Sequence, residues 1–384
     1  MRVIGVVTVA RSDYGLYLPV LRRIQAEPDL RLHLIVAGTH LSPDFGLTVR
    51  EIERGGFPIG DRVEMMLSSD TPEGVAKSMG LGTIGFAQAY ARSRPDILLV
   101  LGDRFEMHAA VVAALPFGIP VAHIHGGELT LGAMDDALRH SITKMSHLHF
   151  VATEDYARRV IQMGEEPWRV LVSGSPGLDG LLSTPLLSRE ELERRYRLDL
   201  SAPFLLVTYH PVTLEIEQLE TQMNELLAAL DEVGMTTVFT YPNADTRSRL
   251  VIQMTREYAA ARPHVRVVVN LGTPGYVSAM RFAAAMVGNS SSGIIEAASF
   301  QLPVVNIGSR QQGRARGKNV IDVGYGREEI AAGIRQALSP EFRASLVGLV
   351  NLYGDGHAAE RIVRRLKEVE LDDRLFRKRF YEER

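Results

Sequence analysis

The sequence predicts an α/β protein made of two similar halves, each built around a parallel sheet. Short apolar runs rich in β-branched residues alternate with segments of helical spacing along the chain. This alternation is typical of βαβ units, whose strands run parallel. A turn-rich segment, SGSPGLD at Ser173–Asp179, interrupts the pattern, which then restarts. We therefore expect a first domain at 1–174, a second at 175–365 and a helical tail at 366–384.

Length and composition fit a globular protein of roughly two to three domains. Of its 384 residues 46% are hydrophobic and 23% are charged, and the net charge of −3 predicts no general affinity for nucleic acid or an anionic membrane. The chain has no cysteine, which excludes disulfides and thiolate chemistry. The first apolar run lacks a convincing signal-peptide cleavage site, and the longest, Ala109–Ala122, is too short to span a bilayer. We therefore expect a cytoplasmic protein.

The first half begins with the continuous apolar run Val3–Val9, which is typical of a strand buried on both faces. Helical spacing of leucine and isoleucine follows at Leu16–Gln25. The elements expected next are, in order, the strand Leu32–Ala37, the helices Thr48–Arg54 and Val75–Arg92, the strand Ile97–Leu101, the helix His108–Leu115, the strand Pro120–Ile124, the helix Asp136–Met145, the strand Leu148–Val151 and the helix Glu154–Met163.

The second half repeats the alternation, although no short sequence motif is repeated. Its expected strands are Phe204–Thr208, Thr236–Thr240, Val265–Val269, Ala285–Val287 and Val304–Ile307. Its expected helices are Glu217–Glu232, Thr246–Ala261, Tyr276–Ala284 and Ser292–Ser299. The densely charged tail carries interspersed leucine and phenylalanine residues, so we expect it to pack on a domain; a solvated tail is the alternative.

Charged residues gather after two strands of the first half. Asp103 and Arg104 follow the run ILLVLG, and Glu128 follows IPVAHIHGG. Ligands of open α/β sheets bind beyond the carboxyl ends of parallel strands, so these residues are candidates for a site.

A third block, DDALRH, completes this region. Asp135 and Arg139 are four residues apart, as are Asp136 and His140, so each pair shares a face if the block is helical. Ordinary surface ion pairs are the alternative for any one of these residues.

Two strand-to-helix turns could hold an anion, because helix N-termini favour phosphate. In VTVARSDYG the candidates are Arg11, Ser12 and Asp13, with a plain N-cap as the alternative. The turn VGNSSSGIIEAAS is the stronger candidate. It offers Ser291, Ser292 and Gly293 at the helix start and Glu296, which could accept hydrogen bonds from ribose hydroxyls; a serine-capped helix is the alternative.

Further polar groups follow other strands of the second half. His210 lies just past one strand and Asn243 past the next. Arg310 and Arg314 follow the strand VVNI and are candidates for pyrophosphate contact, whereas Arg316 is expected at the surface.

Several other functions are not supported by the sequence. GLGTIG at Gly80–Gly85 matches a dinucleotide pattern but follows a helical segment rather than a strand. No HExxH or G-x-S-x-G motif occurs. We expect no metal and no hydride cofactor.

Taken together, these blocks resemble the hydrolysing nucleotide-sugar 2-epimerases of sialic and legionaminic acid synthesis. The matching pieces, in the family's order, are RSDYG, HLSPDFG, GDRFE, HIHGGE, RHSITKMSHLHF, HPVT, NSSSGIIEA and NIGSRQQGR. The resemblance implies a GT-B fold of two Rossmann-like domains with an interdomain cleft that holds the active site, and a homodimer or higher homo-oligomer. It also implies a metal-free, redox-neutral reaction. A nucleoside diphosphate is eliminated across C1–C2 of an N-acetylhexosamine, and water then adds to the resulting 2-acetamidoglucal to release the 2-epimeric sugar.

The resemblance also implies roles for the residues. It supports Asp103 and Asp135 as acid–base groups, with Arg104 and Arg139 beside them. Some relatives carry glutamate in place of His125, so either His125 or Glu128 could take that role. The leaving diphosphate would be stabilised by His210, Arg11, Arg310, Arg314 and the helix start at Ser291–Gly293.

Three alternatives remain open at this point. A non-hydrolysing 2-epimerase would carry R-P-E after the first strand, where this chain has RSDYG. A GT-B glycosyltransferase would need an acceptor pocket, and a nucleotide-sugar sensor would not need the carboxylates. UDP or GDP, and the substituents at C4 and C6 of the sugar, are not determined by these motifs; HIHGGE slightly favours a 2,4-diacetamido-trideoxy sugar.

Overall fold

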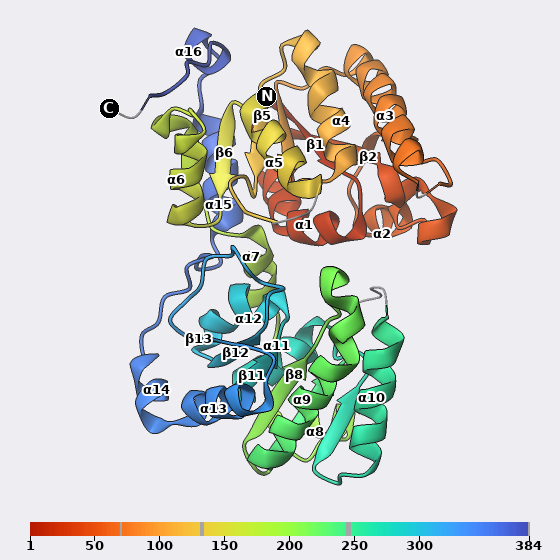
Figure 1. Ribbon diagram of the computed structural model, residues 1–384. Helices are drawn as coiled ribbons and strands as arrows, with labels where there is room; N and C mark the ends of the chain where they lie inside the picture. The colour runs from red at the N-terminus through yellow and green to blue at the C-terminus, as the bar shows by residue number, and fades with distance from the viewer. Residues whose placement is uncertain (70, 131–133, 243–246, 383–384) are drawn as a thin grey trace. The chain divides into compact units, whose positions relative to one another are not determined.

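The computed structural model describes residues 1–69, 71–130, 134–242 and 247–382. The chain forms two compact units (Figure 1): unit 1 contains Met1–Leu182 and Gly354–Arg384, and unit 2 contains Ser183–Tyr353. Both are Rossmann-like α/β domains, so the predicted fold class is confirmed. This division places the boundary after α7 rather than at 174, and returns the chain to unit 1 before residue 365.

Unit 1 contains a seven-stranded sheet in the order β3-β2-β1-β4-β5-β6-β7, and every paired strand runs parallel. Its strands are β1 (Arg2–Thr8), β2 (Leu30–Ala37), β3 (Ile59–Val63), β4 (Ile97–Leu101), β5 (Val121–Ile124), β6 (Leu148–Val151) and β7 (Val170–Val172). Its α-helices are α1 (Arg11–Ala26), α2 (Val49–Arg54), α3 (Pro72–Arg92), α4 (Phe105–Ala114), α5 (Met134–Met145), α6 (Glu154–Gln162), α7 (Pro176–Leu182), α15 (Ala358–Glu368) and α16 (Asp373–Phe376).

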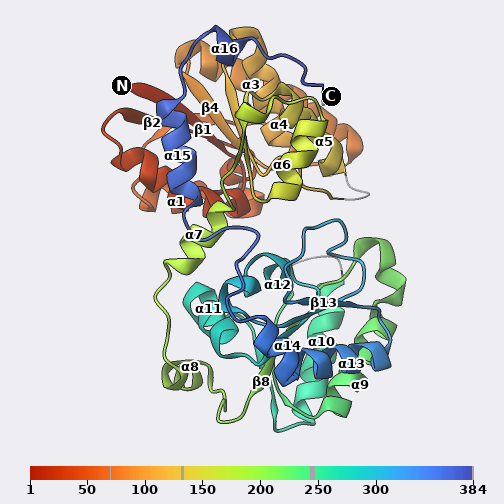
Figure 2. The ribbon, with the colours of Figure 1, turned by 90° about the vertical axis from the view of Figure 1, so that its left-hand side faces the viewer.

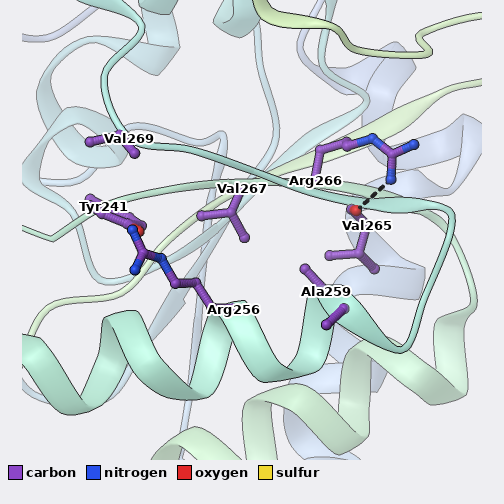
Figure 3. A pocket seen from close by; sticks show the side chains of 8 residues that line it. Tyr241, Arg256, Ala259, Val265, Arg266, Val267 and Val269 are labelled. Carbon is purple, nitrogen blue, oxygen red and sulfur yellow. Dashed lines mark hydrogen bonds between the residues drawn. The ribbon is translucent and has the colours of Figure 1, made fainter.

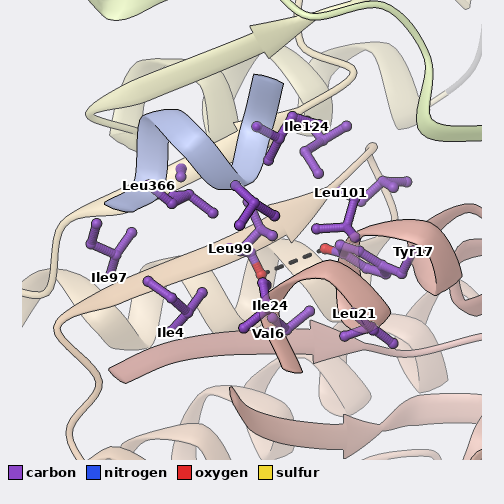
Figure 4. Packing of buried hydrophobic residues seen from close by; sticks show 14 of the residues in the cluster. Ile4, Val6, Tyr17, Leu21, Ile24, Ile97, Leu99, Leu101, Ile124 and Leu366 are labelled. Carbon is purple, nitrogen blue, oxygen red and sulfur yellow. Dashed lines mark hydrogen bonds between the residues drawn. The ribbon is translucent and has the colours of Figure 1, made fainter. Parts of the chain in front are cut away.

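Apolar side chains cover both faces of this sheet, because parallel strands are buried on both sides. On one face Val6 and Leu99 pack with α1 and α15, and Figure 4 shows Leu366 of α15 among them. On the other face Val7 and Val100 pack with α3 and α4. Figure 2 shows the helices on both sides of the sheet. The Tyr17 hydroxyl, buried against this core, donates to the Leu99 carbonyl at 3.5 Å.

Helices α7 and α15 belong to unit 1 through a specific contact. The Asp179 carboxylate of α7 accepts the backbone N–H groups of Ala358 and Ala359, at 3.0 and 2.7 Å, and so caps α15. This contact explains why the turn at Ser173–Asp179 is not the boundary between the units.

The tail is anchored to unit 1 by side chains rather than by a long helix. Lys378 Nζ donates to the Ser146 carbonyl at 2.6 Å and to Glu165 at 2.9 Å. Arg169 donates to the carbonyls of Leu375 and Arg374, at 3.0 and 2.7 Å. The tail thus packs on unit 1, and its helical part consists of the end of α15, up to Glu368, and the four residues of α16.

Unit 2 contains a six-stranded parallel sheet in the order β10-β9-β8-β11-β12-β13. Its strands are β8 (Phe204–Thr208), β9 (Thr236–Thr240), β10 (Val265–Val268), β11 (Ala285–Gly288), β12 (Val304–Ile307) and β13 (Val320–Val323). Its α-helices are α8 (Arg189–Tyr196), α9 (Leu219–Val233), α10 (Ser248–Ala260), α11 (Gly272–Phe282), α12 (Ser291–Ile295), α13 (Arg327–Leu338) and α14 (Pro340–Ser345). On one face Val207 and Val287 pack against α9 and α13.

The GLGTIG segment lies inside α3, where its glycines allow close packing. A Cβ on Gly82 would lie 2.5 Å from Met65 Cε, and one on Gly85 would lie 2.6 Å from Val63 Cγ1. The segment therefore fits α3 against the chain at β3 and is not a phosphate-binding turn. Among the described residues, no helix is both long and apolar enough to cross a membrane.

Candidate active site

Each sheet has one point where the strand order reverses, between β1 and β4 in unit 1 and between β8 and β11 in unit 2. The chain leaves such neighbouring strands toward opposite faces, so space opens beyond their carboxyl ends, where ligands of open α/β sheets bind. Several of the predicted site residues lie in the turns or helix starts that follow these four strands, and others follow neighbouring strands.

Asp103 lies just beyond β4 and forms an ion pair with Arg139 of α5. The same guanidinium donates to Thr130 Oγ1 at 3.0 Å. The side chains of Arg139 and Asp103 are only 8% and 20% exposed. An arginine partner favours the charged form of a carboxylate, so Asp103 is held as an acceptor that can take a proton.

Helix α5 carries both pairs predicted to share a face. Asp136 Oδ2 lies 3.6 Å from His140 Nε2, as the spacing predicts, and Asp136 Oδ1 accepts the Thr130 N–H at 2.8 Å. Arg139 forms its ion pair with Asp103, from the turn after β4. This ion pair thus joins α5 to the end of β4.

Arg104 forms a second ion pair, with the buried Glu106. Its Nη2 and Nε atoms bind the two carboxylate oxygens of Glu106, at 2.8 and 3.2 Å. Burial alone would lower the pKa of the Arg104 guanidinium, but the negative charges of Glu106, Asp13 and Asp135 raise it overall. Arg104 therefore remains cationic near Asp135.

His125 and Glu128 come together at the end of β5. His125 Nδ1 lies 2.5 Å from Glu128 Oε1, and both side chains are largely buried. The His125 backbone has a φ of +65°, a left-handed conformation that is uncommon for residues other than glycine. Such strain is concentrated at functional sites. The other ring nitrogen, Nε2, lies 3.3 Å from Ser175 Oγ.

His123 supports this loop and is fully buried. Its Nε2 bonds the Gly102 carbonyl at 2.8 Å, and its Nδ1 lies 3.2 Å from Thr143 Oγ1. Burial lowers the pKa of His123 to about 3, so the ring is neutral and joins the end of β5 to that of β4. His123 therefore has a structural role in this loop.

The three candidate residues at the start of α1 differ in their exposure to solvent. Arg11 and Ser12 are exposed, and Arg11 Nε lies 3.6 Å from Glu51. Asp13 is buried, and its carboxylate accepts the N–H groups of Val9 and Ala10 at 2.8 and 2.9 Å. Burial raises the pKa of Asp13 to about 6 despite these hydrogen bonds. The structure therefore gives Asp13 a capping role rather than contact with a ligand.

In unit 2 the turns after β8, β11 and β12 are joined through Asn289. Its side chain accepts the His210 N–H at 2.7 Å and donates to the His210 carbonyl at 2.8 Å. The Asn289 carbonyl accepts Arg310 Nη1 at 3.2 Å and Gln311 Nε2 at 2.9 Å. These contacts fix the backbone at His210 and bring Arg310 to the end of β11.

The serine turn after β11 gathers hydroxyl groups around a carboxylate. Ser290 caps α12, and Ser291 and Ser292 are its first residues. The Tyr276 hydroxyl, from α11, bonds Ser290 and Ser292, and burial raises the pKa of Tyr276 to about 12, with the charge of Glu296 adding to the effect. Burial likewise raises the pKa of Glu296, against a hydrogen bond with Ser292.

Gly293 is buried because α12 packs closely on β12: a Cβ there would lie 2.8 Å from Val304 Cγ1. Its role is thus in packing as well as in the helix start.

The remaining predicted residues of unit 2 are placed as follows. Arg314 is half-buried in the loop after β12. Arg316 forms an ion pair with Asp322 at 2.7 Å, as expected for a surface residue. Asn243 lies outside the described residues.

A hydrogen-bond network around the Glu215 carboxylate connects the turns of unit 2 described above. Glu215 accepts hydrogen bonds from Ser309 and Tyr325, each at 2.5 Å, and from Gln222 at 3.0 Å. Burial would raise the pKa of Glu215, but these bonds lower it overall. Glu215 therefore joins the turn after β8 to the loop after β12.

Two residues in these clusters were missed by the sequence analysis. Ser175 was assigned to a domain boundary, and Tyr276 to the first turn of a helix; serine and tyrosine give no signal without the contact that positions them. Among the described residues, no group of three or more histidine, aspartate or glutamate side chains is placed to hold a metal ion.

A surface hollow of about 390 Å³ lies elsewhere, between α10 and the edge strand β10 (Figure 3). Arg256 and Arg266 line it, and the Arg256 guanidinium lies 5.5 Å from the Tyr241 ring centre. None of the predicted site residues is part of its lining.

Comparison with known proteins connects this geometry to one family. A family model described as UDP-N-acetylglucosamine 2-epimerase matches residues 22–367. The hydrolyzing UDP-N,N′-diacetylbacillosamine 2-epimerase of Legionella pneumophila is 39% identical over 98% of this chain and 99% of that protein. The hydrolyzing GDP/UDP-N,N′-diacetylbacillosamine 2-epimerase of Campylobacter jejuni is 41% identical over 84% of each chain.

A solved structure has a similar fold. The UDP-GlcNAc 2-epimerase of Neisseria meningitidis, bound to UDP-GlcNAc, matches with a TM-score of 0.77 over 95% of this chain and 99% of that chain. The sequence identity is 19%, so this likeness concerns the fold alone.

Proposed function

This chain belongs to the UDP-N-acetylglucosamine 2-epimerase family, and we propose that it hydrolyses UDP-N,N′-diacetylbacillosamine with inversion at C2. The products are UDP and the free 2,4-diacetamido-trideoxy sugar of manno configuration. Two relatives at 39% and 41% identity are named for this hydrolysing reaction, which favours it over non-hydrolysing epimerisation and over glycosyl transfer. In the structure, this proposal is best supported by two largely buried contacts at the strand ends of unit 1, Asp103 with Arg139 and His125 with Glu128.

The proposed reaction has two steps. A base removes the C2 proton, the C–H electron pair forms the C1=C2 bond, and the C1–O bond breaks as the diphosphate leaves with its electron pair. Water then adds to the 2-acetamidoglucal: its oxygen bonds C1 and loses a proton to a base, while an acid protonates C2 from the opposite face. The net change is addition of one water molecule and inversion at C2.

Two proton-transfer groups are required, because the proton leaves and returns on opposite faces of C2. We assign one to Asp103, which its ion pair with Arg139 holds as a carboxylate. We assign the other to His125 with Glu128, whose contact of 2.5 Å lets a ring and a carboxylate share one proton. Asp135, beside the cationic Arg104, is assigned to water activation at C1.

We assign diphosphate binding to unit 2, whose donors gather at the ends of β8 and β11. Arg310 and Arg314 provide positive charge, and His210 and the start of α12 provide hydrogen-bond donors. Glu296 is assigned to the ribose hydroxyls. Donors that are already held in place stabilise the leaving diphosphate without reorganisation.

We further propose that the protein acts in the cytoplasm as a homo-oligomer, and that its product supplies the synthesis of sialic or legionaminic acids. The resemblance of its motifs to the hydrolysing branch of the family supports this assignment.

The test compares three substrates: UDP-N,N′-diacetylbacillosamine, its GDP analogue and UDP-N-acetylglucosamine. We expect release of UDP and free sugar, with kcat/KM for the first substrate at least about tenfold above that for UDP-N-acetylglucosamine, because a site built for a second acetamido group loses its hydrogen bonds when that group is absent. Equal or better turnover of UDP-N-acetylglucosamine would contradict the substrate assignment. An epimer that remains attached to the nucleotide would contradict hydrolysis.

A further inference from the structure

We propose that Ser175 is a positioning residue for His125, completing a hydrogen-bonded chain that runs from Ser175 through His125 to Glu128. This inference rests on the proposed function, in which His125 and Glu128 exchange a proton with the substrate. It adds a third residue, which lies 47 positions beyond Glu128 in the sequence.

The chain uses both nitrogens of the imidazole. Glu128 Oε1 lies 2.5 Å from Nδ1, and Ser175 Oγ lies 3.3 Å from Nε2. A carboxylate only accepts hydrogen bonds, so the proton of neutral His125 lies on Nδ1. Nε2 then carries the lone pair, and the Ser175 hydroxyl is the group that donates to it.

A hydroxyl suits this position because it can serve both protonation states of the ring. It donates to Nε2 when His125 is neutral, and it accepts from Nε2–H after the ring has taken a proton. A rotation of the Ser175 hydroxyl is enough to change between the two. The hydroxyl therefore keeps a hydrogen bond to the ring in both protonation states, which holds the orientation of the ring.

The backbone that carries Ser175 is itself fixed within unit 1. Ser175 is 4% exposed and lies directly before α7. The Ser173 N–H donates to the Val151 carbonyl at 3.0 Å, and Arg361 Nη1 of α15 donates to the Ser173 carbonyl at 3.2 Å. The segment that leads into Ser175 is thus held at Ser173 between β6 and α15, whereas His125 lies at the end of β5.

Ser173 provides a matched control in the same loop. It is also buried, but its hydroxyl bonds only backbone carbonyls in the contacts of the described structure, with Gly174 O at 2.9 Å and Val151 O at 3.5 Å. Ser173→Ala removes a buried hydroxyl of the same size without touching His125.

The experiment measures Ser175→Ala, Ser175→Thr and Ser173→Ala by steady-state kinetics, by thermal unfolding and by the nitrogen-15 shift of His125 Nε2, assigned with His125→Gln. For Ser175→Ala we expect kcat to fall roughly tenfold to a hundredfold with KM nearly unchanged, because the ring loses its orientation. The Nε2 shift should move toward that of a nitrogen without a hydrogen bond. Ser175→Thr should restore both, and Ser173→Ala should change neither.

Other outcomes would overturn the inference. One is a Ser175→Ala variant whose kcat and Nε2 shift equal those of the wild type. A second is a folded Ser175→Thr variant that restores neither kcat nor the Nε2 shift. A third is a loss of kcat in Ser173→Ala as large as that in Ser175→Ala. If Ser175→Ala does not fold, Ser175→Cys gives the same comparison with a weaker hydrogen bond. If the wild-type protein does not turn over any of the nucleotide sugars, the proposed function is overturned instead. In that case the Nε2 shift alone decides whether Ser175 holds the ring.

Discussion

Asp103 and Arg139 form an ion pair that is largely removed from water, at the position where the proposed reaction needs a base. The proton affinity of each proposed acid–base residue of unit 1 depends on the side chain that it contacts. Substitutions that remove a charge but keep the shape therefore test these roles most directly.

Asp103→Asn should abolish turnover while UDP binding survives. The amide cannot take the proton that the carboxylate takes, so we expect kcat to fall by about a hundredfold or more. The dissociation constant for UDP, measured by calorimetry, should remain close to that of the wild type. Asp155→Asn, on exposed α6, is the matched control. Loss of binding together with activity would mean that Asp103 is structural.

Glu296→Ala should mainly weaken binding of UDP. The carboxylate lies beside Ser292 in the turn after β11, where we assign it to the ribose hydroxyls. Loss of a charged hydrogen bond costs roughly 1.5–3 kcal/mol, so the dissociation constant should rise about tenfold or more. Glu296→Gln, which keeps one acceptor, should have a smaller effect. An unchanged dissociation constant in Glu296→Ala would exclude the ribose assignment.

At the scale of elements, the site depends on how each strand ends. Gly288, the last residue of β11, has a φ of +132°, and a Cβ there would overlap the Thr208 carbonyl of β8. Only glycine can end this strand so close to its neighbour and lead into the serine turn.

Gly288→Ala should therefore destabilise the protein by more than about 2 kcal/mol, because the substitution combines backbone strain with a steric clash. Urea unfolding measures the change. Gly80→Ala is the control: Gly80 lies in α3, a Cβ there meets nothing within 4 Å, and alanine should be neutral or stabilise by up to about 1 kcal/mol. Equal stability of the two variants would contradict this account of Gly288.

The tail is held to unit 1 by a buried carboxylate. Burial would raise the pKa of Glu165, but its hydrogen bonds with His149, Lys144 and Lys378 outweigh that effect and lower it to about 2, from 4.5. The folded value lies below the unfolded one, so this stabilisation is complete above pH 4.5 and is lost as the pH falls toward 2.

Glu165→Gln should thus cost roughly 3 kcal/mol of unfolding free energy at pH 7, since it leaves the largely buried Lys378 and the partly exposed Lys144 without their carboxylate. The difference between wild type and variant, measured by urea unfolding between pH 7 and 3, should shrink as the pH falls below 4.5. A difference that stays constant over this range would show that Glu165 is not the titrating group.

For the whole molecule, the sequence predicted the two sheets well but missed three strands. These are β3, β7 and β13, and each lies at the edge of its sheet. Edge strands are buried on fewer sides, so their apolar runs are short and give a weak signal. The domain boundary was misplaced for a related reason: Asp179 caps α15 across 179 positions of sequence, and no local pattern reports such a contact.

For the candidate site, the sequence predicted positions along the chain but not the contacts between them. Strand-end placement predicted Asp103, Glu128 and His210 as site candidates, because the end of a parallel strand can be recognised from the apolar run before it, and each of them lies beyond such a strand. The side chains that each residue contacts could not be predicted in this way. Helical spacing placed Arg139 on one face with Asp135 but could not predict its long-range ion pair with Asp103.

The most direct test of the account follows the C2 proton. The protein is incubated with UDP-N,N′-diacetylbacillosamine in deuterated water and the mixture is observed by proton NMR. We predict a free sugar of manno configuration that carries deuterium at C2, together with released UDP, because the proton is removed by one group and returned from solvent by another. A free sugar that keeps its original C2 proton and configuration, or an epimer that is still joined to UDP, would contradict hydrolysing epimerisation.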